Sequence, residues 1–379
     1  MKYEDTFYLS LTGKNSHKVT IKAGHGNLTI GATGISKGKH DAWVDEDALI
    51  SWNALEEHDH RKDIGWPRGI SYEGNDNSFI EWADKRPIQG FVWKPTKDVV
   101  ADLTNANIRS FELHVDKGKV DLTLSEKVSY VRIHGNLENV TFVKCPNDFA
   151  LSFRSFQKRQ EKPIYQLPLY PNASGARDVS VLGEVDGEPF DCSSLLQFTC
   201  MKSLCIYGNA MNLSALAKLE HLESINLQRM SNLEGMPKLE TWKNLKHFYV
   251  DTIEETVGKQ LKAELKVLQK EREFSEYSGV YKLKKAIWFT TEYNIPFSKW
   301  EDKKGKAAKS CLKEMRKAKS ESDAHQAIVT FVTNINNLED IETEEREGVF
   351  VAVGQLVEFS GLDIGQEMWA EWFDDVRDF

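Results

Sequence analysis

The chain has 379 residues, 40% of them hydrophobic and 28% charged, with a net charge of −9, a composition typical of globular and not of disordered proteins. It has no apolar run near the roughly eighteen residues of a membrane span, and its start, MKYEDTFYLSLTG, lacks the layout of a secretion signal. Five cysteines without a CxxC pair argue against a disulfide framework and against a structural zinc site. We therefore expect a cytoplasmic protein with reduced thiols and, from its length, two or three domains.

Residues 1–86 are predicted to form a small α/β cap domain. Alternating runs at 7–11, 18–23 and 27–32 predict strands arranged in hairpins. A short helix is expected in DEDALISWNALEEHDH, followed by the Gly- and Asn-rich loop IGWPRGISYEGNDN. We expect this cap to cover the N-terminal edge of the sheet that follows, because an exposed strand edge invites pairing with other chains.

Two patterns in the cap could carry chemistry, and both have a simpler explanation. GHGNLTIGATGISKGKH resembles a phosphate loop, but its Gly–Lys pair comes one residue early and His40 stands where Ser or Thr is needed, so hairpin turns are favoured. His58, Asp59 and His60 are adjacent, and adjacent residues on a helix point in different directions, which favours a polar surface run over a metal site. With no other catalytic motif recognised, the sequence predicts no enzyme activity, no cofactor and no bound metal.

Residues 87–251 repeat an apolar pattern at positions 1, 4 and 6 of units about 20–28 residues long. Positions 4 and 6 alternate as strand residues do. The clearest copies are Met201/Leu204/Ile206, Leu222/Ile225/Leu227 and Leu245/Phe248/Val250. Earlier copies start at 88, 108 and 128, and weaker ones at 148 and 176, where a fortuitous match is the alternative.

This segment resembles the leucine-rich-repeat family, most closely over Met201–Val250, where the LxxLxL pattern is nearly literal. The family's usual Asn is mostly missing, with Asn209 the nearest match, which indicates irregular coils. The resemblance implies an α/β fold in which an irregular leucine-rich-repeat solenoid of parallel strands lies between the cap and a helical C-terminal domain. It also implies that residues beside the buried pair face the concave side. That row includes Glu112, His114, Tyr130, Arg132, His134, Arg154, Tyr207, Asn226, Gln228, His247 and Tyr249.

Residues 252–379 are predicted to form a helical domain. Thr252 and Glu255 match a capping box, and further helices are expected at about 303–319, 322–336, 344–359 and 364–377. The apolar stripe of the last helix, which includes Trp372 and Phe373, is expected to dock within this domain. Charge is divided here, since Lys299–Lys319 has a net charge of +6 and Glu339–Phe379 of −11.

These features favour a protein-binding function. The plan is loosely similar to that of bacterial leucine-rich-repeat immunity proteins, which implies a monomer that neutralises one protein partner, a basic antibacterial toxin domain, without nucleic acid or membrane. The partner is expected on the concave row, with the acidic end adding electrostatic steering. The acidic residues singled out are Glu342, Glu344, Glu345 and Glu347. Two alternatives stay open: an enzyme with a site in the cap around residues 58–61, and a general adaptor or scaffold.

Overall fold

The structure, a computed structural model, describes residues 4–22, 25–58, 66–155, 165–183, 188–286, 288–289, 303–338 and 343–378. The chain divides into two compact units, 1–283 and 284–379, which are described separately. The domain limits predicted from the sequence lie instead at residues 86 and 251. No helix in the described ranges has both the length and the apolar character needed to cross a bilayer.

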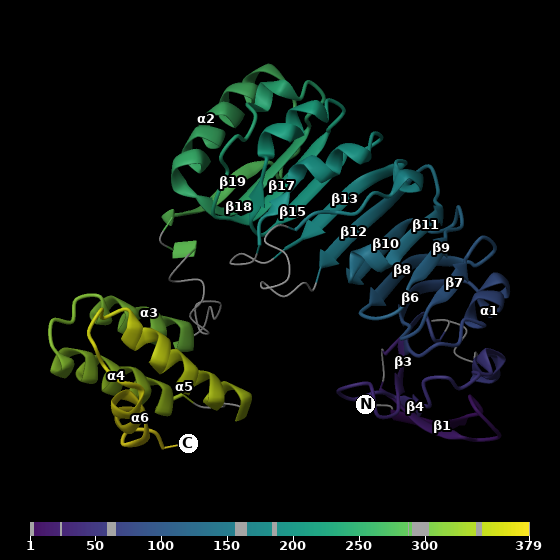
Figure 1. Ribbon diagram of the computed structural model, residues 1–379, viewed down its shortest axis with the longest axis horizontal. Helices are drawn as coiled ribbons and strands as arrows, with labels where there is room; N and C mark the ends of the chain where they lie inside the picture. Colours follow the sequence, from purple (N-terminus) through teal and green to yellow (C-terminus); the bar gives the residue numbers. More distant parts are fainter. Residues whose placement is uncertain are drawn as a thin grey trace. The chain divides into compact units, whose positions relative to one another are not determined.

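A twelve-stranded sheet is the main feature of unit 1, and its strands from β3 to β18 pair in parallel. Apart from β4 at one edge, the strands follow one another across the sheet in chain order (Figure 1). The strands are β3 (Asn27–Ala32), β4 (Ala42–Val44), β5 (Gly69–Glu73), β6 (Ile88–Lys94), β8 (Ile108–Val115), β10 (Tyr130–Gly135), β12 (Phe149–Ser155), β13 (Ala176–Leu182), β15 (Ser203–Tyr207), β17 (Ser224–Met230), β18 (His247–Glu254) and β19 (Gly279–Lys284). The predicted large sheet of parallel strands is therefore confirmed.

The apolar residues at positions 4 and 6 of each repeat lie on one face of this sheet and are buried. In-register pairing places Leu204, Ile225 and Phe248 side by side on neighbouring strands. The side chains at positions 4 and 6 are buried in every copy, including the weak ones at Leu151/Phe153 and Val179/Val181, since each is at most 1% exposed. Parallel strands that alternate apolar and polar residues thus stack their apolar side chains into continuous ladders.

A second layer covers this apolar face. It begins with a three-stranded parallel sheet of β7 (Val99–Asp102), β9 (Val120–Thr123) and β11 (Val140–Lys144). Later repeats carry 3-10 turns instead, namely η4 (Cys192–Gln197), η5 (Leu213–Lys218) and η6 (Leu239–Thr241). Shorter pieces are η2 (Leu137–Asn139), η3 (Pro171–Ala173) and the pair β14 (Phe190–Asp191) and β16 (Ala210–Met211). Both layers contribute to one hydrophobic core. The opposite face of the large sheet, which bears the alternate side chains, is called the open face below.

The N-terminal region differs from the prediction. β1 (Glu4–Leu9) and β2 (His17–Lys22) form the expected antiparallel hairpin, but β3 joins the large sheet in parallel with β4 and β5, so the hairpin predicted for residues 27–32 is wrong. Its Leu28 and Ile30 align with Ile70 and Tyr72 of β5, which continues the apolar ladders. The helix expected within 45–60 is the 3-10 turn η1 (Trp52–His58), and α1 (Phe79–Lys85) was not foreseen. Alternation predicts a strand but not its partner.

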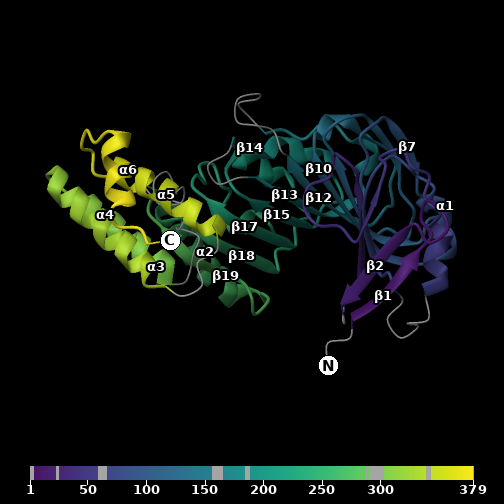
Figure 2. The same ribbon diagram turned by 90° about the horizontal axis from the view of Figure 1, so that it is seen from below.

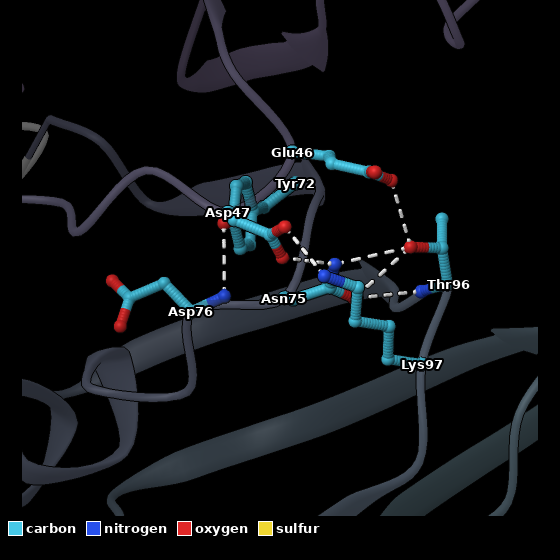
Figure 3. A network of polar contacts seen from close by, with 7 residues as sticks. All are labelled: Glu46, Asp47, Tyr72, Asn75, Asp76, Thr96 and Lys97. Atoms are coloured by element: carbon cyan, nitrogen blue, oxygen red, sulfur yellow. Dashed lines mark hydrogen bonds and ion pairs between the residues drawn. The ribbon is translucent and has the colours of Figure 1, made fainter.

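A polar network ties together the loops that follow β4, β5 and β6 (Figure 3). The Asn75 amide donates to Asp47 at 2.9 Å and to the Thr96 hydroxyl at 3.0 Å, and its carbonyl accepts from the Thr96 backbone at 2.9 Å. The backbone amide of Asp76 donates to the Tyr72 hydroxyl at 3.1 Å. Because these groups bond to one another across three loops, the network fixes the strand ends.

The C-terminal end of unit 1 corrects the predicted capping box. Thr252 lies buried in β18 with φ +56 and donates its hydroxyl to Asp251, so it does not cap a helix. Helix α2 (Glu255–Glu271) is capped instead by Glu254, whose carboxylate accepts from the backbone amides of Thr256 and Val257. The segment from α2 to β19 belongs to the same compact unit as the sheet.

In its described part, unit 2 is built from α3 (Lys303–Met315), α4 (Glu321–Asn336), α5 (Thr343–Glu358) and α6 (Gln366–Asp374), in good agreement with the predicted helices. A capping box between Ser320 and Asp323 starts α4. Phe331 and Leu356 are central to the core of this unit. Trp372 and Phe373 of α6 are buried in the same core, which confirms the predicted docking of the last helix.

Candidate binding face

Strand register arranges the open-face side chains in three rows across β8 to β18. Figure 2 shows the backbone of strands β10 to β18 side by side in this sheet. The first row is Ser110, Tyr130, Ala150, Asp178, Ser203, Ser224 and His247. The second is Glu112, Arg132, Ser152, Ser180, Cys205, Asn226 and Tyr249. The third is His114, His134, Arg154, Leu182, Tyr207, Gln228 and Asp251. Every strand residue predicted for the partner-binding row lies in one of these rows.

The rows continue towards the N-terminus through β6 and β5, where Val92 and Ser71 extend the second row. Strands are spaced about 4.8 Å apart, so the stretch from β5 to β18 is on the order of 38 Å long. That length suits a standard protein–protein interface of about 800 Å² on each partner.

Glu112, His114 and His134 form a tight cluster at the centre of β8 and β10. Glu112 Oε1 lies 2.8 Å from His114 Nε2 and 3.3 Å from His134 Nε2. The two imidazoles are stacked, with centroids 4.3 Å apart and planes 4° from parallel. The hydrogen bond with His114 and the nearby cations lower the pKa of Glu112 against the effect of its burial. This carboxylate is therefore ionised at neutral pH.

His134 was expected to be exposed on the concave row, and this is wrong, because it is only 6% exposed. Its ring is covered by the stacked ring of His114. Desolvation, together with the charge of His114, lowers the pKa of His134 to about 4. The ring is neutral at pH 7.

Arg132 and Tyr130 hold the other side of the Glu112 carboxylate. Arg132 Nη1 lies 3.2 Å from Glu112 Oε2, while its Nε donates to the Tyr130 hydroxyl at 2.9 Å. The guanidinium also lies over the Tyr130 ring, 5.3 Å from its centroid. The ion pair between Glu112 of β8 and Arg132 of β10 thus joins the two strands.

Towards β18 the open face is aromatic, and neighbours hold its side chains in place. The Arg229 guanidinium lies over the Tyr207 ring at 5.3 Å, and Tyr249 packs against Tyr281 at 5.4 Å. Gln228 donates to Asn226 at 3.0 Å, and His247 Nδ1 lies 2.6 Å from the Ser275 hydroxyl.

A hollow of about 420 Å³ lies on the same face over β3 to β8. It exists because Gly69, Gly90 and Ser110 occupy one row, so small residues leave the sheet uncovered there. A Cβ added at Gly90 would meet nothing within 4 Å. This hollow was not predicted, although small residues at three equivalent strand positions were a signal for it.

The other predicted sites are described only in part. His58 lies at the end of η1, where it stacks on Phe7 at 4.3 Å and its Nε2 lies 3.1 Å from the Tyr8 carbonyl, whereas residues 59–61 are outside the described residues. Glu342 is also outside them. Glu344, Glu345 and Glu347 lie on α5, but their side chains are not among those described.

Comparison of the chain with protein-family models, with curated proteins and with solved structures finds no match in any of the three. The role of the open face is therefore inferred from its own chemistry.

Proposed function

We propose that this chain is a protein-binding module that receives one partner protein on the open face of its large sheet. The observation that carries the proposal is the set of in-register rows, in which Tyr130, Arg132, Tyr207 and Tyr249 are all partly exposed. Tyr and Arg are enriched among the residues that dominate binding energy at protein interfaces.

Preorganisation of these side chains supports the proposal. Arg132 is held by Glu112 and Tyr130, and Tyr207 is held by Arg229. Ordering a long side chain on binding costs about 0.5–1.5 kcal/mol, and a side chain that is already ordered avoids much of that cost.

The finer proposal is an irregular leucine-rich-repeat solenoid that acts in the cytoplasm as an immunity protein against an antibacterial toxin. The repeated unit of strand and 3-10 turn from β13 to β18 supports the first part. The charge of −11 from Glu339 onward supports a basic partner, since opposite charge speeds encounter.

The test is binding kinetics against the protein that co-purifies with the tagged full chain. Tyr207→Ala together with Tyr249→Ala should mainly raise the dissociation rate, because central anchors set residence time. The matched control is Val100→Ala with Val143→Ala, two exposed residues of the second layer, which should leave both rates unchanged. Equal effects of the two double variants, or no effect of the tyrosine pair, would show that the open face is not the interface.

Steering is tested separately with a variant of the acidic end. Neutralising its four singled-out glutamates should slow association, and the loss should shrink as salt rises. The residues to change to Gln are Glu342, Glu344, Glu345 and Glu347. The immunity role adds that co-expression of the chain protects cells from the identified partner, and absence of protection leaves only the binding role.

A further inference from the structure

We propose that Glu112, His114 and His134 form a binding site for a transition-metal ion, with Zn²⁺ as the best match. Each residue offers one ligand atom, and these atoms lie within 4.8 Å of one another. Glu112 and His114 come from β8 and His134 from β10, so strand pairing creates the cluster. The inference does not depend on the proposed partner.

The distances are close to those of a zinc site. Zinc bonds of about 2.0–2.1 Å in tetrahedral geometry place ligand atoms about 3.3 Å apart. Glu112 Oε1 already lies 3.3 Å from His134 Nε2 and 2.8 Å from His114 Nε2. The distance between the carboxylate and His134 therefore already matches that between two zinc ligands, and the distance to His114 is about 0.5 Å shorter.

One ring must turn for both imidazoles to bind one ion. An ion lies in the plane of the imidazole that binds it, and the two rings are now stacked with planes 4° from parallel. The His134 side chain is 8% exposed and held in the sheet, whereas that of His114 is 27% exposed. His114 is therefore the ligand that rotates, from the solvent side onto the ion.

Arg132 supplies an outer contact of the kind that ligating carboxylates have in metal sites. Arg132 Nη1 forms an ion pair with Glu112 Oε2 at 3.2 Å, and its Nε donates a hydrogen bond to Tyr130. Because Oε2 is engaged in this way, Oε1 is the oxygen that faces the two imidazoles. The positive charge of Arg132 also opposes that of the ion, so we expect weaker binding than at a structural zinc site. Three protein ligands leave a fourth position for water or a ligand group.

The ligand set selects the class of metal. Two imidazole nitrogens and one carboxylate suit zinc and its neighbours in the transition series, whereas Ca²⁺ and Mg²⁺ prefer sites made of oxygen atoms. Zn²⁺ and Co²⁺ are therefore the ions to use, and Mg²⁺ is the negative control.

The experiment titrates the chelator-treated full chain with Zn²⁺ by calorimetry and with Co²⁺ by visible absorption. We expect one ion per chain, and a Co²⁺ spectrum with the intensity of a tetrahedral site. Glu112→Gln and His114→Ala should each weaken binding by at least about 100-fold, since outer contacts alone are worth 10–100-fold. Removing the outer contact with Arg132→Met should move affinity less than either ligand variant.

His247→Ala is the matched control, because His247 is an imidazole on the same face that pairs with Ser275. It should bind Zn²⁺ as the unchanged chain does. Circular dichroism of each variant establishes that the sheet is intact, and His114 is the imidazole chosen for removal because it is the more exposed of the two. Absence of stoichiometric Zn²⁺ binding, or binding unchanged in both ligand variants, would overturn the proposal.

Discussion

Truncating Leu227 to Ala tests whether the ladder of buried residues holds the large sheet together. Leu227 is fully buried, and its neighbours in register are Ile206 and Val250. The substitution removes three carbons, which at about 0.8 kcal/mol each corresponds to about 2.4 kcal/mol of lost transfer free energy. Incomplete closure of the cavity adds to this, and we expect the free energy of unfolding to fall by about 3–4 kcal/mol.

The assay is urea denaturation of the full chain followed by tryptophan fluorescence. Trp66, Trp93 and Trp242 are fully buried in unit 1 and report on its unfolding. Ser224→Ala is the matched control, since Ser224 lies on the open face of the same strand and should change stability by less than about 0.5 kcal/mol. A loss below about 1 kcal/mol for Leu227→Ala, or equal losses for the two variants, would refute the reasoning.

The remaining predictions concern a buried carboxylate, a partly exposed one and the hollow. Asp76 is buried and accepts hydrogen bonds from the backbone amides of Ile50 and Ser78, the Ser78 hydroxyl and the Trp52 indole. Because Asp76→Ala leaves these donors unsatisfied, it should lower the free energy of unfolding by about 2–4 kcal/mol, as measured by urea denaturation. Hydrogen bonds from Lys202 and Lys246 lower the pKa of Glu223 from 4.5 to about 2. The contribution of this carboxylate to stability is therefore present above pH 4.5 and is lost as pH falls towards 2. A Glu223 carboxyl that titrates near 4.5 in an NMR pH series would contradict this. Gly90→Trp should fill the hollow without unfolding the sheet, and it should reduce partner binding. Circular dichroism measures the first effect and binding kinetics the second. Unchanged binding would show that the partner leaves β6 uncovered.

Local patterns predicted much of this protein. The rhythm at positions 1, 4 and 6 identified buried strand residues from Ile88 to Val250, including the weak copies, because alternation along a strand decides which face each side chain takes. Helical periodicity predicted the helices of unit 2, since an apolar stripe needs no knowledge of its partner. The predicted cap at Thr252 failed because backbone pairing kept that residue within β18.

The sequence by itself determined the repeat strands from Ile88 to Val250, the helices of unit 2 and which of their side chains are buried in the core. Only the tertiary structure decided that β3 and β5 extend the same parallel sheet as the later repeats, and that His134 becomes buried beneath His114. It also brought Glu112 to both rings and placed Gly69 and Gly90 side by side. The reason is that alternation within one segment decides which face a side chain takes, whereas the contacts between side chains depend on how segments some twenty residues apart pack against one another.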